Sequence, residues 1–147
     1  MDSIAGNFLL VRADALSLLL PLDGIGAAGY LEEEPKATEL PGLFTTGHAD
    51  QSRFVIAPSG RLRPLAHYPA ARFVVTPLAF EGKNILVAWS EMKVLIAARF
   101  DVHELPPAAT SHGSPVRGYV RMGGRPVFRT DPQRLLGFMF SGAGPDD

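Results

Sequence analysis

The sequence lacks cysteine entirely, and it lacks an excess of charge of either sign. Its 147 residues contain 14 Lys and Arg against 15 Asp and Glu, which gives a net charge of -1. The absence of cysteine excludes disulfide bonds and thiolate metal sites and is typical of a reducing compartment. The small net charge provides no general attraction to nucleic acid or to anionic membranes. The composition therefore predicts a cytoplasmic protein that binds no nucleic acid.

A long uninterrupted hydrophobic run is also missing. Residues 8–22 are strongly apolar, but Arg12 and Asp14 interrupt them. A membrane-spanning helix needs about 20 consecutive apolar residues. The N-terminus also lacks the basic start and the small-residue cleavage site of a signal peptide. We therefore expect no membrane insertion and no secretion.

The usual catalytic and metal-binding motifs are absent as well. The four histidines are His48, His67, His103 and His112, and none occurs in an H-x-x-x-H or H-E-x-x-H pattern. A metal ion needs three or four ligands in a defined geometry. The chain has no G-x-S-x-G elbow and no P-loop. The sequence predicts a protein that is not an enzyme and assigns it no catalytic residue, cofactor or metal ligand.

One pattern, Gly24 to Gly29, spells G-x-G-x-x-G after an apolar strand. A dinucleotide site needs a long helix that begins at these glycines. Here only residues 30–34 follow before Pro35, which would stop such a helix. We interpret the glycines as a small-residue turn where the backbone packs closely.

The clearest local structure signals lie between Arg117 and Leu136. Gly123-Gly124 is a two-residue hairpin turn, because glycine accepts positive φ at both central positions. The predicted cross-strand pairs are Met122 with Arg125, Val120 with Val127 and Tyr119 with Phe128. After the hairpin, Asp131 is a predicted helix cap, Pro132 a first helical position, residues 133–136 about one turn, and Gly137 the stop.

Further strands are predicted where short apolar runs flank turn residues. Residues 7–12 and 16–21 form one predicted hairpin, residues 53–58 and 61–66 form another around Ser59-Gly60, and residues 85–89 and 93–100 are strands. Pro77 is expected to end the segment before it, and residues 31–43, 45–51 and 105–115 are expected loops. Eight to ten short strands with very little helix indicate an all-β barrel or sandwich.

Three of these segments resemble the CheW family, the coupling proteins of bacterial chemosensory arrays. The resemblance rests on FLLVRADALSLLLPLDGI near the N-terminus, on FVIAPSGRLRPLAHY in the middle, and on the hairpin and Leu-Leu pair of residues 118–136. It implies an all-β fold of two small, packed, SH3-like five-stranded β-barrels with short helices. It also implies a single domain over residues 1–147, built from two intertwined β-subdomains.

The middle segment departs from the family motif of Gly, apolar residues, Arg-Gly and then Pro-x-x-Asp-Leu. Gly60 and Pro64 match, whereas Ser59 stands at the Arg position and Phe54 at the first Gly. In the family this segment is part of the surface that meets receptor and kinase. The resemblance therefore predicts a set of partner-binding residues. They are Ile25, Ile56, Ser59, Gly60, Arg61, Leu62 and Pro64, with Arg61 or Arg63 as a displaced charge.

The function that the resemblance implies is that of a non-catalytic adaptor or scaffold in a chemotaxis or pilus-motility pathway. The expected partners are the regulatory domain of a CheA-type histidine kinase and the cytoplasmic tip of a chemoreceptor. The alternative is a small-ligand or metal-binding β-barrel, with or without enzymatic activity, that uses His48, His67 or His103. The arginines of the C-terminal hairpin do not form a nucleic-acid-binding stripe, because Arg121 is expected on one face and Arg125 on the other.

Overall fold

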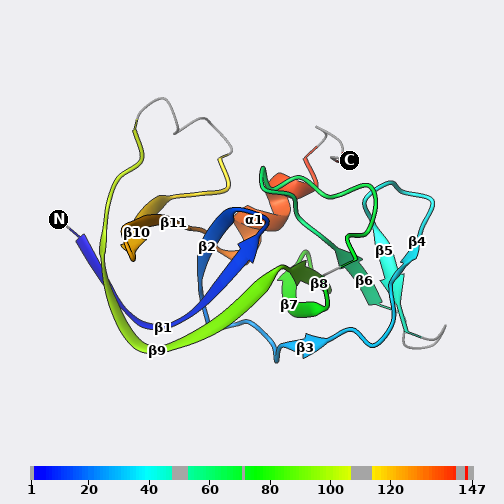
Figure 1. Cartoon of the computed structure of the whole chain (residues 1–147), viewed down its shortest axis with the longest axis horizontal. Helices are drawn as coiled ribbons and strands as arrows, with labels where there is room; N and C mark the ends of the chain where they lie inside the picture. The colour runs from blue at the N-terminus through cyan, green and yellow to red at the C-terminus, as the bar shows by residue number, and fades with distance from the viewer. Residues whose placement is uncertain (1, 48–52, 71, 107–113, 142–144, 146–147) are drawn as a thin grey trace.

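The structure is a computed structural model, and it describes residues 2–47, 53–70, 72–106, 114–141 and 145. These residues form eleven strands, arranged as two curled sheets, and one short helix (Figure 1). This arrangement confirms the predicted all-β fold class. In the part of the chain that is described, no helix is long and apolar enough to cross a membrane.

The first sheet, called sheet A here, has the strand order β10-β11-β2-β1-β9. Its strands are β1 (Asp2–Ala13), β2 (Leu16–Pro21), β9 (Glu91–Val102), β10 (Gly118–Met122) and β11 (Arg125–Arg129). The end of β9 returns to β10, where the backbones of His103 and Tyr119 exchange two hydrogen bonds of 2.8 and 3.0 Å. A Cβ on Gly118 would lie 2.9 Å from the carbonyl oxygen of His103. Glycine at this position therefore lets sheet A close into a barrel.

Both hairpins of sheet A were predicted. Strands β1 and β2 pair antiparallel, from Phe8 opposite Pro21 to Ala13 opposite Leu16. Strand β1 begins earlier than expected because it also pairs with β9, starting with Asp2 opposite Val102. A bulge interrupts that second ladder beside Asn7, whose side-chain oxygen accepts a hydrogen bond of 2.9 Å from the N–H of Ala97.

The β10–β11 hairpin has the predicted register. Gly123 and Gly124 have φ values of 59° and 79°, as a type I′ turn requires. The following helix, α1 (Pro132–Met139), begins as expected, because the Asp131 carboxylate accepts a hydrogen bond from the N–H of Arg134. The predicted stop at Gly137 is wrong. The helix continues for two residues beyond it, and Met139 is buried in the core.

The second sheet, called sheet B, has the strand order β3-β7-β8-β6-β5-β4. Its strands are β3 (Gly29–Tyr30), β4 (Lys36–Ala37), β5 (Phe44–Thr46), β6 (Arg53–Ile56), β7 (Val74–Phe80) and β8 (Lys83–Trp89). Pro77 does not end a segment but lies within β7. It is tolerated because β3 covers the outer edge of β7 only at Val74 and Val75. Thr45 and Thr46 were expected in a loop but pair with β6.

The predicted hairpin around Ser59-Gly60 is wrong. Strand β6 pairs in parallel with β8, and the residues after it form a compact turn in place of a second strand. Pro58 and Pro64 form an isolated antiparallel bridge, flanked by backbone hydrogen bonds from Leu65 to Ala57 and from Ser59 to Arg63. Parallel pairing requires a long crossover connection. The crossover from β6 to β8 consists of the loop between β6 and β7, called the crossover loop below, and of β7 itself. The turn at Ser59-Gly60 therefore belongs to this crossover loop and joins no pair of strands.

The alternation of side chains along the strands fills three hydrophobic clusters. In β1, Phe8 faces the interior of sheet A, whereas Leu9 and Val11 face the opposite side. In β8, Leu86 faces the interior of sheet B, whereas Val87 faces the opposite side. These outward residues and the helix form one cluster shared by both sheets, as expected when successive residues of a strand point to opposite faces.

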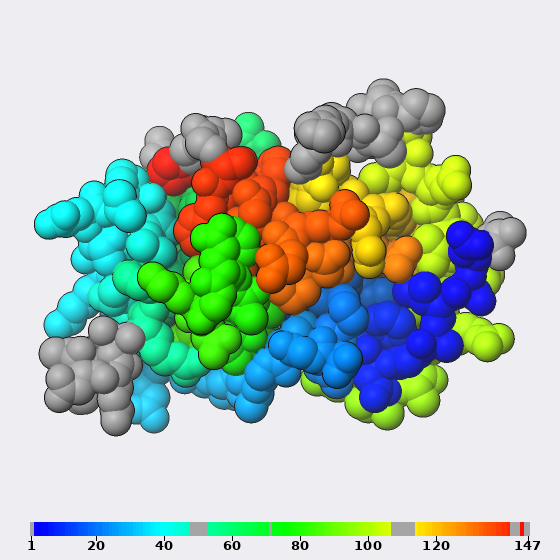
Figure 2. Space-filling view, turned by 180° about the vertical axis from the view of Figure 1, so that it is seen from behind, coloured from blue at the N-terminus to red at the C-terminus, as the bar shows by residue number. Residues whose placement is uncertain are grey.

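The shared cluster is the largest of the three and holds the helix in place. Leu135 and Leu136 of α1 are fully buried in it, beside Trp89 of β8. The indole N–H of Trp89 donates to the hydroxyl of Thr76 at 2.9 Å, so the buried polar atom is satisfied. Seen from behind, the helix in orange-red lies beside the green end of the β7–β8 hairpin (Figure 2).

Candidate partner-binding surface

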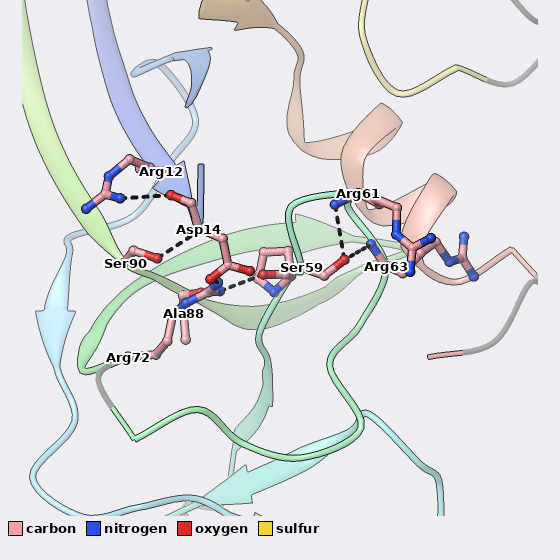
Figure 3. Close-up of polar contacts among 9 residues, drawn as sticks. Arg12, Asp14, Ser59, Arg61, Arg63, Arg72, Ala88 and Ser90 are labelled. Carbon is pink, nitrogen blue, oxygen red and sulfur yellow. Dashed lines mark hydrogen bonds and ion pairs between the residues drawn. The ribbon is translucent and has the colours of Figure 1, made fainter. Parts of the chain in front are cut away.

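Of the predicted site residues, Ser59 and Arg61 lie in the crossover loop of sheet B, near the β1–β2 turn of sheet A (Figure 3). Asp14, in the β1–β2 turn, has a φ of 54°, and its N–H donates to the Ser90 hydroxyl at 3.1 Å. Arg12 donates to the Asp14 carbonyl oxygen at 2.8 Å. Gly60 lies against this turn, because a Cβ placed on it would lie 3.8 Å from Asp14 Cβ.

Arg72 is the buried centre of this junction, with a relative exposure of 2%. Its guanidinium donates to the carbonyl oxygens of Pro58 and Ala88 at 2.6 and 3.1 Å. It also donates to the Asp14 carboxylate at 3.0 Å. A buried guanidinium costs several kcal/mol unless its charge is paired and its donors are satisfied. The Asp14–Arg72 pair therefore links the turn of sheet A to the loop of sheet B.

Ser59, at the Arg position of the family motif, organises the loop from within. Its hydroxyl oxygen accepts hydrogen bonds of 3.2 Å from the N–H groups of Arg61 and Arg63. Its own N–H donates to the Arg63 carbonyl oxygen at 2.7 Å. Such side-chain bonds to nearby backbone favour turns over strands. Ser59 is 6% exposed and therefore presents little surface to a partner.

Arg63 points inward and fastens the loop to the helix. Its guanidinium donates to the carbonyl oxygens of Phe138 and Ser141 at 2.7 and 2.8 Å and lies 5.1 Å from the centre of the Phe138 ring. A cation at a helix C-terminus is stabilised by the helix dipole. Of the two candidate displaced charges, only Arg61 is exposed.

Burial divides the predicted partner-binding residues into two groups. Ile56 and Leu62 are 1% and 3% exposed and belong to the shared cluster. Ser59 and Pro64 are also buried. The side chains of these four residues therefore support the surface from below, and their part in partner binding stays a prediction. Gly60 and Ile25 are partly exposed and Arg61 is exposed, so these three are accessible to a partner.

Ile25 lies apart from the loop, at another edge of the shared cluster. It packs against that cluster together with Met92 of β9. Val94 follows Met92 by two residues and is paired with Leu9, so it shares their face of sheet A and is 45% exposed. Ile25 and Met92 are therefore two partly buried apolar residues at the rim of the shared cluster.

The glycine-rich segment next to Ile25 behaves as a close-packed turn. Gly24 has a φ of 83°, and a Cβ on Gly26 would lie 2.6 Å from Cγ of Pro77. Gly29 belongs to strand β3. No helix follows these glycines before Pro35, so the geometry of a dinucleotide-binding helix N-terminus is absent from this segment.

The structure also contains an apolar groove that was not predicted from the sequence. It has a volume of about 710 Å³ and is lined by Phe54, Phe80 and Phe140 among others. The rings of Phe80 and Phe140 stack with centroids 5.5 Å apart. The one signal in the sequence was Phe54, a large apolar residue at the first Gly position of the family motif.

The histidines do not converge among the described residues. His103 stacks on Tyr119 with ring centroids 5.1 Å apart, and His67 is exposed. His48 and His112 lie outside the described residues. Within the described ranges, no group of three or more His, Cys, Asp or Glu side chains is placed to hold a metal ion.

Tyr68 has the clearest change in protonation behaviour near the loop. Burial raises its pKa to about 12, against the smaller opposing effect of the Arg72 charge. Its hydroxyl donates to the carbonyl oxygen of Arg72, and its ring packs edge-on against Phe44 at 5.3 Å. The phenol thus stays neutral and supports the segment that carries the buried arginine.

Comparison with known proteins bears on the fold. No protein-family model matches the sequence, and no curated protein matches it. Among solved structures, the chain is similar to the scaffolding protein TtCheW from Thermoanaerobacter tengcongensis, with a TM-score of 0.60 and 12% sequence identity. The match covers 98% of this chain and 98% of that one. The whole chain therefore has the fold of that scaffolding protein.

Proposed function

We propose that this chain is a CheW-like scaffold, a non-catalytic cytoplasmic adaptor in a bacterial chemosensory or pilus-motility pathway. The observation that carries the proposal is the structural match to a scaffolding protein, which extends over nearly the full length of both chains. Its proposed partners are the regulatory domain of a CheA-type histidine kinase and the cytoplasmic tip of a chemoreceptor. The sequence motifs at both ends of the chain support the same assignment.

The proposed contact residues are Ile25, Gly60 and Arg61. Ile25 offers a partly exposed apolar side chain that a receptor tip can cover, because apolar residues with a polar rim are typical of docking sites. Arg61 places a positive charge two residues after Ser59, the position where the family carries its arginine. The internal bonds of Ser59 support this displacement, because they fix the backbone from which Arg61 projects.

We also propose that residues 1–147 form one domain made of two intertwined β-subdomains. The cluster shared by both sheets and the helix supports this division, since neither sheet can bury its outward residues alone. The chain also passes directly from β8 in one sheet to β9 in the other, with only Ser90 between them.

The test is a binding measurement with the purified kinase regulatory domain and receptor tip encoded in the same genome. The native chain is expected to bind at least one of them, and Ile25→Glu and Arg61→Glu are expected to weaken binding about tenfold each. Leu40→Glu is the matched control, because Leu40 is 63% exposed and lies outside the proposed contacts. A chain that is folded but binds neither partner would refute the proposal.

A further inference from the structure

The arginines of the C-terminal hairpin are not used by the proposed function. Between Arg117 and Arg134 the chain carries five arginines and a single carboxylate, Asp131, a net charge of +4. Asp131 is shared, with ion pairs of 3.8 Å to Arg117 and 3.4 Å to Arg134. One carboxylate therefore serves two of the five arginines, and the hairpin retains an excess of positive charge.

The remaining positive charge is concentrated at the hairpin tip. Arg121 and Arg125 are exposed on either side of Gly123-Gly124. Within the described part of the chain, neither has a carboxylate within ion-pair distance. At the base of the hairpin, burial and the neighbouring charge of Arg117 lower the pKa of Arg129. Two arginines thus lie close together at the base of the hairpin, and two more flank its turn.

Arg121 also contacts a row of aromatic side chains formed by His103, Tyr119 and Phe128, called the Tyr119 row below. Its guanidinium carbon lies 5.9 Å from the centre of the Tyr119 ring. Tyr119 in turn stacks on His103 at 5.1 Å and lies 6.3 Å from Phe128. An arginine that rests on a ring loses less conformational entropy when it binds a carboxylate than a fully mobile one does. One face of the hairpin therefore offers a partner both aromatic rings and the positive charge of Arg121.

We propose that the tip of the β10–β11 hairpin is a docking surface for an acidic segment of a partner protein. Arg121 lies on the Tyr119 face of the hairpin and Arg125 on the opposite face, so the segment would pass over the exposed Gly123-Gly124 turn. One of its carboxylates would meet Arg121, another would meet Arg125, and an apolar or aromatic side chain would lie on the Tyr119 row. This surface is separate from Ile25 and Arg61, and the inference does not depend on the scaffolding role.

The neighbouring charges favour a short acidic segment over a nucleic acid. Asp101 and Glu104 are exposed on either side of His103, and Asp2 lies close enough to raise the pKa of Arg129, against the larger lowering effects. A long polyanion that follows the row would meet these carboxylates and be repelled. A short segment can contact the tip alone.

The experiment uses the full chain and a fluorescein-labelled peptide of alternating glutamate and tyrosine, with fluorescence anisotropy as the readout. The native chain is expected to bind the peptide with an affinity that falls as salt rises. Arg121→Glu with Arg125→Glu is expected to weaken binding at least about tenfold. Lys93→Glu with Arg99→Glu is the control, because it changes the net charge equally on exposed positions of β9.

Three results would overturn the inference: no binding of the peptide to the native chain, an equal loss in the β9 control, or tighter binding of an oligothymidylate of matched charge. Arg121→Gln with Arg125→Gln provides a milder second variant if charge reversal disturbs folding. Thermal unfolding followed by the fluorescence of buried Trp89 verifies that each variant is folded.

Discussion

The β10–β11 hairpin and the Ser59–Pro64 loop both present a glycine turn to sequence analysis, yet only the hairpin was predicted. The hairpin is held by contacts between residues close in sequence, such as Val120 with Val127. The loop has the local hydrogen bonds of Ser59, but distant groups fix its place, since Arg63 bonds Phe138 and Ser141, and Leu62 enters the shared cluster. Turn chemistry reveals local pairing, whereas a segment that depends on distant partners carries little local signal.

Among the tests of this comparison, Leu62→Ala is expected to have the largest effect on the unfolding free energy. Leu62 is fully buried although its φ of 60° is unfavourable for a non-glycine residue. Its side chain therefore contributes more than the backbone strain costs, and its loss is expected to reduce the unfolding free energy by about 3 kcal/mol. Chemical denaturation measures this change. The control Met122→Ala, near the tip of the hairpin, should cost about 1 kcal/mol, and equal losses would contradict the comparison.

Alanine substitution of the turn glycines is expected to have a smaller effect on stability, and it compares the two turns directly. Gly124 has a φ of 79° with open space around it, so Gly124→Ala is expected to cost about 1–2 kcal/mol through backbone strain alone. Gly124→Asn should recover part of that loss, because asparagine tolerates this conformation. Gly60 lies outside the left-handed region, and Gly60→Ala should change stability by no more than about 0.5 kcal/mol. Thermal or chemical unfolding of the three variants decides this, and a larger loss at Gly60 would show that the loop also requires glycine.

The smallest expected effect is the change in unfolding free energy with pH that Tyr68 causes. The pKa of Tyr68 is raised to about 12, so the neutral phenol is favoured in the folded chain. Its contribution to stability is fully present below about pH 10, the unfolded value, and is lost as the pH rises toward about 12. The difference in unfolding free energy between the native chain and Tyr68→Phe should shrink over this window, whereas a constant difference would disprove the effect.

The sequence was sufficient for the fold class and for the elements that rest on local chemistry. The Asp131 cap, the Gly123-Gly124 turn and the β1–β2 hairpin are examples, since each depends on residues within a few positions. The strand through Pro77 was missed because its tolerance depends on the free edge left by the two-residue strand β3. Proline ends a strand only where its missing N–H would be required for a hydrogen bond to a neighbouring strand.

The burial of the candidate site residues could not be predicted from the sequence, for a related reason. Position in a family motif does not determine burial, and Ile56, Ser59, Leu62 and Pro64 proved to lie beneath the surface. Arg72 connects the two sheets, but nothing in the sequence distinguishes it from the other arginines. Its role appears only when Pro58, Ala88 and Asp14 are brought around it.

The pairing of β1 with β9 also constrains how this chain can be synthesised. Asp2 pairs with Val102, so about two thirds of the chain must leave the ribosome before the first strand can find its second partner. Until then β1 has only β2 beside it, and its other edge is an open template for unwanted pairing. Such distant pairing slows folding because a long loop must close first. The nascent chain, rather than the finished protein, is therefore the state most exposed to aggregation.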